Sequence, residues 1–215
     1  MEMKKLIIIG GGGHALSVLE AMDTSIEIAG YVDNIESKKL ILPYLGNDEF
    51  VLSNFSPEEY RVHHAVVYTN DVNLSLRSRI IQQYEGYESY TIIARSALVT
   101  SSSKIAGGCA LMEGAIVNGA ILAQNSVINT KAVIEHGCIL GNNVFVGRGC
   151  STDGRRVIHP ARHFFSRMSS TPKYRPHAIN VQLAPCQKPV SVHTASRLKM
   201  CRAGEHRLPP SGIYR

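Results

Sequence analysis

His136 is the residue of this chain best suited to proton transfer, and it lies in a repetitive stretch, VINTKAVIEHGCILGNN, residues 127–143. Histidine titrates near neutral pH, so it can take a proton from a nucleophile and return it to a leaving group. Around it, Ile128, Ile134 and Leu140 recur every six positions. A period of six fits neither an α-helix nor an ordinary strand and is typical of hexapeptide-repeat β-helices. A histidine that only occupies an exposed turn of the repeat is the alternative.

A second group of residues could bind phosphate and sugar groups. Four glycines, Gly10 to Gly13, follow a short apolar run, and Asp33 comes twenty residues after them. Glycines let the backbone N–H groups at a helix N-terminus approach a pyrophosphate, and the acid can accept hydrogen bonds from ribose or sugar hydroxyls. Gly10, Gly12 and Ala15 match the dinucleotide fingerprint G-x-G-x-x-A. A glycine turn with a purely structural role is the alternative.

The elements that would position the glycines and Asp33 form a strand, turn, helix and strand in that order. Apolar runs and helical spacing predict a strand at 5–9, a helix at 14–22, a strand at 26–34, a later strand at 65–71 and a helix at 74–84. This order is the first unit of a Rossmann-like sheet. We therefore expect an α/β domain over residues 1–95.

The residue pattern changes after residue 95, where bulky aliphatic residues recur at intervals of six with one step of five. These positions are Val99, Ile105, Leu111, Val117, Leu122, Ile128, Ile134, Leu140 and Val146. A small residue precedes most of them by two positions, and Cys138 occupies one of these small-residue positions. The pattern predicts a three-sided parallel β-helix of three coils over residues 96–150. It also favours packing over nucleophilic chemistry for Cys138.

The last part of the chain differs in charge and composition. Residues 1–150 carry 11 Lys and Arg against 15 Asp and Glu, whereas residues 151–215 carry 12 against 2 and hold seven of the nine prolines. We find no period of six after Cys150. The sequence therefore predicts an irregular basic tail over 151–215, either disordered or translated out of the original frame.

Several classes of protein are disfavoured by composition. The apolar run at Leu6–Ile9 is too short for a secretory signal or a membrane span. Five cysteines without a CxxC pair argue against a disulfide framework and a zinc site, so we expect a protein of the reducing cytoplasm. His159 and His163 have ligand-like spacing but no carboxylate nearby, so no metal site is expected.

Residues 1–150 resemble the sialic acid O-acetyltransferase and UDP-4-amino-sugar N-acetyltransferase family, also called the NeuD/PglD-like group. The matching stretches are IIIGGGGHA, YVDN, ARSALVTSSSKI, LMEGAIVNGAIL and VINTKAVIEHGCILG. The resemblance implies a left-handed β-helix, acetyl-CoA as donor, a nucleotide sugar or sialic acid of surface-glycan biosynthesis as acceptor, and a homotrimer. It also implies a general base at His136 and acceptor contacts at Gly12, Gly13, His14, Asp33, Asn34 and Thr69.

The chain departs from the family pattern at three places near these residues. Gly137 stands where the family usually has an acid that orients the base, Phe145 where a second histidine would fall, and Thr69 where glycine is usual. The tail also lacks the hexads that would complete the coenzyme A site. We therefore expect weak acetyl transfer or none.

Two other functions remain open at this point. A dinucleotide-dependent oxidoreductase would use the same glycine loop, although a domain that ends near residue 95 leaves little room for a nicotinamide pocket. A non-enzymatic protein whose basic tail binds nucleic acid through phosphate contacts is the other, although the tail has no recognisable binding fold. Neither would require His136.

Overall fold

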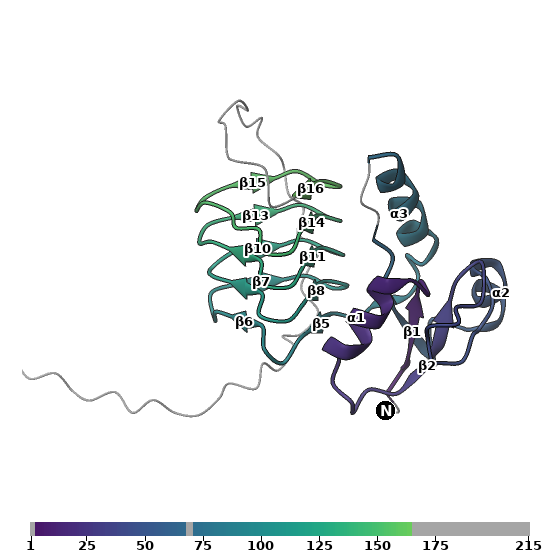
Figure 1. Ribbon diagram of the computed structural model, residues 1–215. Helices are drawn as coiled ribbons and strands as arrows, with labels where there is room; N and C mark the ends of the chain where they lie inside the picture. Colours follow the sequence, from purple (N-terminus) through teal and green to yellow (C-terminus); the bar gives the residue numbers. More distant parts are fainter. Residues whose placement is uncertain (1–2, 68–70, 165–215) are drawn as a thin grey trace, which may run out of the picture. The chain divides into compact units, whose positions relative to one another are not determined.

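The computed structural model describes residues 3–67 and 71–164 of the 215-residue chain (Figure 1). The first domain contains a four-stranded parallel sheet in the order β2-β1-β3-β4. Its strands are β1 (Lys5–Ile9), β2 (Ile28–Val32), β3 (Tyr60–His64) and β4 (Glu88–Ser89). The predicted strands at 5–9 and 26–34 and the α/β class of this domain are confirmed.

Three helices accompany the sheet, namely α1 (Gly13–Ala21), α2 (Asp48–Asn54) and α3 (Asp71–Gln83). Central strand β1 is apolar on both faces: Leu6 and Ile8 pack in one core cluster with α1, and Ile7 and Ile9 pack in another with Val51 of α2. A continuous aliphatic run is what a strand buried on both faces requires. The sheet therefore holds the turn after β1 rigidly between two cores.

The strand predicted at 65–71 lies earlier in the chain. The structure places β3 at Tyr60–His64, paired along its whole length with β1, and residues 65–67 follow it outside the strand. Two histidines, His63 and His64, occupy buried positions of β3. Because polar residues are rare at such positions, the run looked unlike a strand in the sequence.

The buried histidines make the domain sensitive to acid. Burial is the main cause that lowers the pKa of His64 to about 3 and that of His63 to about 4. The unfolded chain binds protons below pH 6.5 while the folded chain does not, so the free energy of unfolding falls as the pH falls from 6.5 towards 4. We expect a loss of about 1 kcal/mol per pH unit for each histidine.

Denaturant titrations at pH 7.0, 5.5 and 4.5 would measure this loss. Both ring nitrogens of His64 are buried without a hydrogen-bond partner among the described residues, so His64→Leu should make the stability less dependent on pH. His136→Leu, at an exposed position, is the matched control. An equal pH slope for His64→Leu and the unmodified chain would contradict the explanation.

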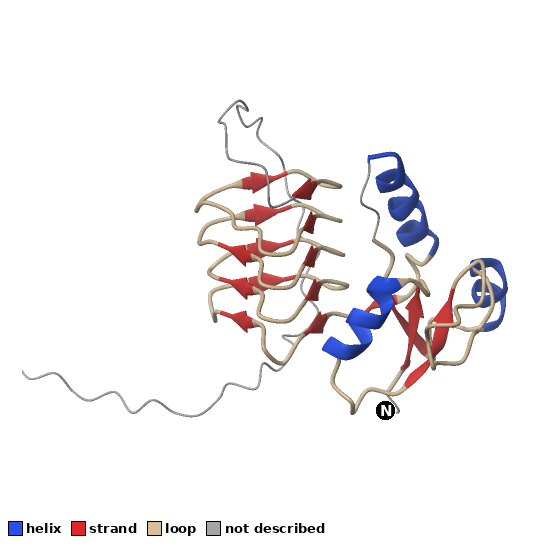
Figure 2. Ribbon diagram, in the orientation of Figure 1, coloured by secondary structure: helices blue, strands red, loops and turns tan. Residues whose placement is uncertain are grey.

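The second domain is a parallel β-helix built from two-residue strands (Figure 2). Its three sheets have the orders β15-β13-β10-β7, β16-β14-β11-β8-β5 and β12-β9-β6. The strands are β5 (Ile92–Ile93), β6 (Leu98–Val99), β7 (Lys104–Ile105), β8 (Ala110–Leu111), β9 (Ile116–Val117), β10 (Ile121–Leu122), β11 (Val127–Ile128), β12 (Val133–Ile134), β13 (Ile139–Leu140), β14 (Phe145–Val146), β15 (Val157–Ile158) and β16 (His163–Phe164). The predicted β-helix is confirmed.

The interior of the β-helix consists of aliphatic stacks, one for each face. Ile128, Ile134 and Leu140 are all fully buried, as the six-residue period predicts. Each stacks on the residue that pairs with it one coil away, for example Leu140 on Leu122. Cys138 is also fully buried and belongs to the same core cluster, which agrees with a packing role.

The β-helix continues past Cys150, where the sequence predicts its end. Strand β15 pairs with β13, and β16 pairs with β14, so regular coils extend to Phe164. The missed interior residue is Thr152, which is buried and accepts a hydrogen bond from the backbone N–H of Glu135 at 3.0 Å. A polar residue at an interior position concealed the period. The predicted irregular segment therefore begins too early, and residues 165–215 lie outside the described part.

Candidate functional site

The glycine loop joins the end of β1 to the start of α1. Gly10 has a left-handed φ of +108°, and a side chain there would lie 2.8 Å from Val66, so this glycine is required by the fold. Gly12 and Gly13 have nothing within 4 Å of where a side chain would begin. The backbone at the N-terminus of α1 is therefore open to a ligand, as expected for a phosphate-binding loop.

Asp33 holds the glycine loop in place. Its carboxylate oxygen Oδ2 accepts a hydrogen bond from the backbone N–H of Gly11, and Oδ1 accepts one from the N–H of Asn34, both at 2.7 Å. Tyr44 donates its hydroxyl hydrogen to the backbone oxygen of Asp33 at 2.9 Å. Sequence reasoning assigned this acid to a sugar hydroxyl. In the structure both oxygens already bind backbone groups, so the acid also positions the loop.

These residues line a cavity of about 320 Å³, here called the glycine-loop pocket. Five of the six predicted acceptor contacts line it, namely Gly12, Gly13, His14, Asp33 and Asn34. The sixth, Thr69, lies outside the described residues. The pocket also includes residues that sequence reasoning missed, namely Asp48, Ala65, Val66, Val67 and Ile80. They come from distant segments, which only the fold brings together.

His14 contributes a neutral imidazole to the pocket. Burial, followed by the nearby guanidinium of Arg77, lowers the pKa of His14 to about 4. Its ring nitrogen Nε2 is buried without a hydrogen-bond partner among the described residues. A neutral histidine can donate or accept one hydrogen bond at that atom, depending on its tautomer. His14 can therefore complete the contacts of a bound ligand without adding charge.

Arg77 links the pocket wall to the β-helix. This side chain is buried, donates from Nε to the backbone oxygen of Val66 at 2.6 Å and donates from Nη2 to the backbone oxygen of Asn125 at 3.1 Å. Val66 lines the glycine-loop pocket, and Asn125 belongs to a turn of the β-helix. One cation therefore bonds to backbone groups of both domains.

His136 lies in the turn that follows β12 and is exposed. The next coil approaches one edge of its ring: a side chain at Gly154 would begin 3.0 Å from Cε1 and 3.1 Å from Nε2 of the imidazole. The backbone N–H of Arg155 donates to the backbone oxygen of His136 at 2.8 Å. Glycine at position 154 thus allows backbone to approach the ring, and the N–H of Gly154 has no hydrogen bond to another described residue.

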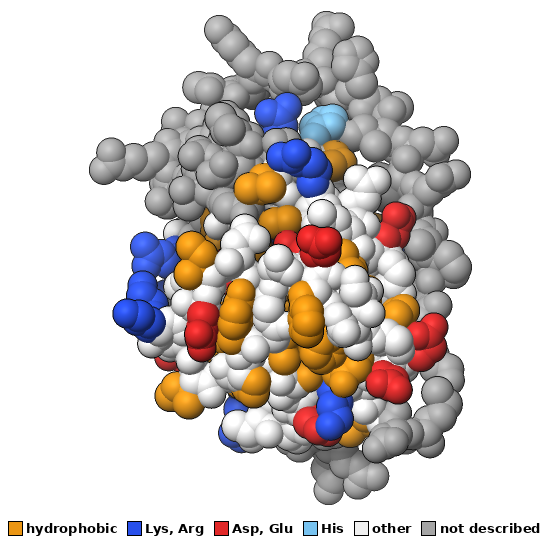
Figure 3. Space-filling model, turned by 90° about the vertical axis from the view of Figure 1, so that its right-hand side faces the viewer, with side chains coloured by type: hydrophobic (Ala, Val, Ile, Leu, Met, Phe, Trp, Pro, Cys, Tyr) orange, Lys and Arg blue, Asp and Glu red, His pale blue; other side chains and the backbone are white. Residues whose placement is uncertain are grey.

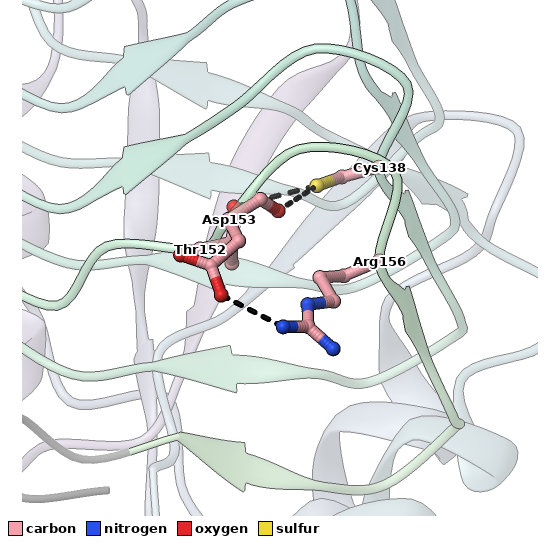
Figure 4. Close-up of polar contacts among 4 residues, drawn as sticks. All are labelled: Cys138, Thr152, Asp153 and Arg156. Atoms are coloured by element: carbon pink, nitrogen blue, oxygen red, sulfur yellow. Dashed lines mark hydrogen bonds and ion pairs between the residues drawn. The ribbon is translucent and has the colours of Figure 1, made fainter. Parts of the chain in front are cut away.

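The corner of the coil above His136 is fixed by polar contacts (Figure 4). The thiol of Cys138 lies 3.4 Å from the hydroxyl of Thr152 and donates to the backbone oxygen of Asp153 at 3.2 Å. Arg156 forms an ion pair with the Asp153 carboxylate at 2.7 Å. The backbone around Gly154 is therefore held on both sides of the position that faces the imidazole.

No carboxylate orients the His136 ring within the described part of the chain. Glu135 instead accepts a hydrogen bond from the side chain of Asn118 at 3.2 Å. Gly137 has a left-handed φ of +71°, and a side chain there would begin 3.0 Å from Arg155. An acid at this position would be strained, since residues with a side chain rarely adopt that conformation. The second departure, Phe145, is buried in the core.

Two features are absent from the described residues. No helix in residues 3–67 and 71–164 is long and apolar enough to cross a membrane. The same residues contain no group of three His, Cys, Asp or Glu side chains that could hold a metal ion.

Comparison with known proteins identifies the domain that carries the glycine loop. The model of the PglD N-terminal domain family matches residues 5–84, which include β1 to β3, the glycine loop and all three helices. Residues 5–84 are therefore similar to the PglD N-terminal domain family. The glycine-loop pocket lies within this PglD-type domain. No curated protein matches the sequence.

The β-helix appears in the solved structures that are similar to this chain. The acetyltransferase domain of PglB from Neisseria gonorrhoeae, in complex with acetyl coenzyme A, is 22% identical with a TM-score of 0.63, over 74% of this chain and 87% of that one. A variant of perosamine N-acetyltransferase from Caulobacter crescentus, in complex with CoA and GDP-perosamine, is 19% identical with a TM-score of 0.51. That match covers 75% of this chain and 93% of the other. Both matches extend well beyond the PglD-type domain, so the two-domain fold is shared.

Proposed function

We propose that this chain is an acetyltransferase that moves an acetyl group from acetyl-CoA to an amine or hydroxyl of a sugar nucleotide or sialic acid in surface-glycan biosynthesis. The observation that carries the proposal is His136 at a β-helix corner, with the backbone of Gly154 against its imidazole. The PglD-type domain supplies an acceptor pocket, and similar structures contain acetyl-CoA, or CoA with a sugar nucleotide.

The geometry suits direct transfer without a covalent enzyme intermediate. The sugar amine or hydroxyl attacks the thioester carbonyl carbon, and the neutral imidazole of His136 takes the proton that the nucleophile loses. The backbone N–H of Gly154, which has no hydrogen bond to another described residue, can donate to the oxyanion that develops on the carbonyl. Collapse breaks the carbon–sulfur bond, and the imidazolium returns the proton to the departing thiolate of coenzyme A.

The acceptor contacts divide between the two domains. Gly12, Gly13 and His14 hold the phosphate-bearing part of the acceptor, Asp33 and Asn34 contact its sugar or ribose, and Thr69 stays a predicted contact at a position outside the described residues. We further propose a cytoplasmic homotrimer whose active sites lie between β-helices. The segment after Phe164 is basic and rich in proline. That it is irregular or translated out of frame stays a prediction.

The two other functions receive less support. Within the described residues the sheet of the first domain has four strands, and the β-helix begins directly after β4, which leaves no second nucleotide-binding half for a dinucleotide. On the part of the face in Figure 3 that the structure describes, basic side chains are scattered among acidic and hydrophobic ones. The described residues of that face therefore form no continuous basic surface of the kind that binds nucleic acid backbones, and the basic tail after residue 164 lies outside the described part.

Release of coenzyme A thiol, measured with a colorimetric reagent, would test the function. Purified full-length chain is incubated with acetyl-CoA and a panel of sugar nucleotides with a free amine, neutral sugar nucleotides and sialic acid. We expect slow, acceptor-dependent thiol release, because no acid orients the base. Mass spectrometry of the acceptor should show one added acetyl group. Thiol release at the same rate with and without every acceptor would contradict the proposal.

Asp33→Ala is expected to weaken acceptor binding about ten-fold, because Gly11 of the glycine loop and Asn34 each lose a hydrogen bond to a charged group. The KM for the acceptor should rise, while the KM for acetyl-CoA should stay near its original value. Glu36→Ala, an exposed acid in the loop after β2, is the matched control. Equal effects of the two substitutions would remove Asp33 from the acceptor site.

A further inference from the structure

The glycine-loop pocket must hold the end of the acceptor that does not react. All of its described lining comes from residues 9–80, and none comes from the β-helix. On the proposed function, the reacting amine or hydroxyl has to reach His136, which belongs to the β-helix. The part of a sugar nucleotide most distant from that group is its base. We therefore expect the base of the acceptor to bind in the glycine-loop pocket.

Asp48 is the polar side chain of the pocket best placed to read a base. Both oxygens of Asp33 already accept backbone hydrogen bonds. Asp48 lines the same pocket, and the hydroxyl of Tyr84 donates to its Oδ1 at 2.7 Å. Tyr84 is 1% exposed and comes from the segment just after α3, so it fixes the orientation of the carboxylate. Oδ2 accepts a hydrogen bond from no described residue.

Part of the remaining pocket lining is aliphatic, which suits the apolar faces of a flat ring. The aliphatic residues Val32, Val66 and Ile80 line the pocket together with the two acids Asp33 and Asp48. A carboxylate accepts hydrogen bonds and repels phosphate and carbonyl oxygens. The phosphates therefore belong at the open N-terminus of α1, by Gly12 and Gly13, and the Asp48 end suits a group that offers N–H donors.

The bases differ in how many adjacent donors they offer to a carboxylate. Guanine presents its ring N1–H beside its 2-amino group, so two parallel hydrogen bonds can form. Uracil presents one N–H between two carbonyl oxygens, which a carboxylate repels. Adenine and cytosine each present an amino group beside a ring nitrogen that is itself an acceptor. Oδ2 of Asp48 accepts from no described residue, and Oδ1 has a second lone pair beside the one that Tyr84 uses. This carboxylate can therefore accept both hydrogen bonds, which favours guanine over the other three bases.

We propose that Asp48, oriented by Tyr84, makes this chain selective for a guanine nucleotide, so that its acceptor is a guanosine diphosphate sugar. The carboxylate of Asp48 accepts hydrogen bonds from N1–H and the 2-amino group of the base. Val32, Val66 and Ile80 surround the ring. This inference rests on the proposed acceptor site and specifies which class of nucleotide the site takes.

Isothermal titration of the full chain with GDP, UDP, CDP and ADP would test the selectivity. GDP should bind at least ten-fold more tightly than the other three. Asp48→Asn should weaken GDP binding roughly ten- to a hundred-fold, since a bidentate contact contributes about that much discrimination, and should leave UDP binding unchanged or improved. Glu49→Gln, an exposed neighbour, is the matched control and should change nothing.

Two further measurements keep the test independent of folding. Inosine diphosphate lacks the 2-amino group, so the unmodified chain should bind it about ten-fold more weakly than GDP. Tyr84→Phe should reduce the preference for GDP over UDP, because Asp48 loses its orienting hydrogen bond. Binding of UDP as tight as GDP, or equal binding of GDP and inosine diphosphate, would overturn the guanine assignment alone. No binding of any nucleotide would instead overturn the acceptor site.

Discussion

Replacing His136 by alanine is expected to lower the rate constant of acetyl transfer about a hundred- to ten-thousand-fold, the usual cost of removing a general base. The substitution should leave the affinity for the acceptor nucleotide nearly unchanged, because the described lining of the glycine-loop pocket lies in the other domain. Single-turnover thiol release measures the rate, and titration with the acceptor nucleotide measures the affinity.

His159→Ala is the matched control, since this histidine belongs to the same β-helix one coil further on. It should keep at least half of the original rate. Turnover that survives His136→Ala would remove the histidine from the mechanism. Loss of both rate and nucleotide affinity would indicate a fold defect instead, which a thermal unfolding curve of the variant would reveal.

Gly154→Val is expected to lower the transfer rate about a hundred-fold without altering residue 136 itself. The added side chain would begin 3.0 Å from Cε1 and 3.1 Å from Nε2 of the imidazole, so the ring must move. A displacement of about 1 Å at a catalytic group can cost a hundred-fold in rate. The branched side chain also shields the N–H that we assign to the developing oxyanion. The rate constant at saturating acetyl-CoA and acceptor is the quantity to measure.

Gly86→Val provides the comparison, because position 86 has nothing within 4 Å of where the side chain would begin. It should change neither the rate nor the thermal stability by much. If Gly154→Val transferred acetyl groups as fast as Gly86→Val, the approach of the coil to the ring would have no catalytic role. The pair therefore separates the effect of position 154 from the general effect of replacing a glycine.

The sequence was most informative where one residue pattern repeats. Nine aliphatic positions at steps of six and five predicted the β-helix interior, because every coil places aliphatic side chains at equivalent interior positions. The aliphatic period is interrupted at Thr152, because the hydroxyl of this residue accepts a hydrogen bond from the backbone N–H of Glu135. Arg156 and Arg162 at small-residue positions added to the concealment. An irregular residue in a repeat hides the pattern without ending the structure.

The candidate site was predictable only in part. The glycines and Asp33 lie close in sequence, so their place at the ends of two neighbouring strands could be predicted, but the hydrogen bond from Gly11 to Asp33 could not. Asp48 enters the same pocket from a separate helix and owes its orientation to Tyr84, 36 positions away. The approach of Gly154 to His136 depends on the pairing of successive coils. Such contacts are set by tertiary packing, which spacing along the chain does not encode.

The pairing of strands across coils also makes length a variable that evolution and protein engineers can alter in whole units. Ile121 pairs with Ile139, and Ile139 with Val157, eighteen residues apart. Duplicating one such eighteen-residue unit before Gly119 would lengthen the β-helix and keep His136 and Gly154 next to each other on the same face. Duplicating a single hexad after His136 would turn Gly154 onto another face. The β-helix should therefore tolerate insertions that add a complete coil, and not insertions of part of a coil.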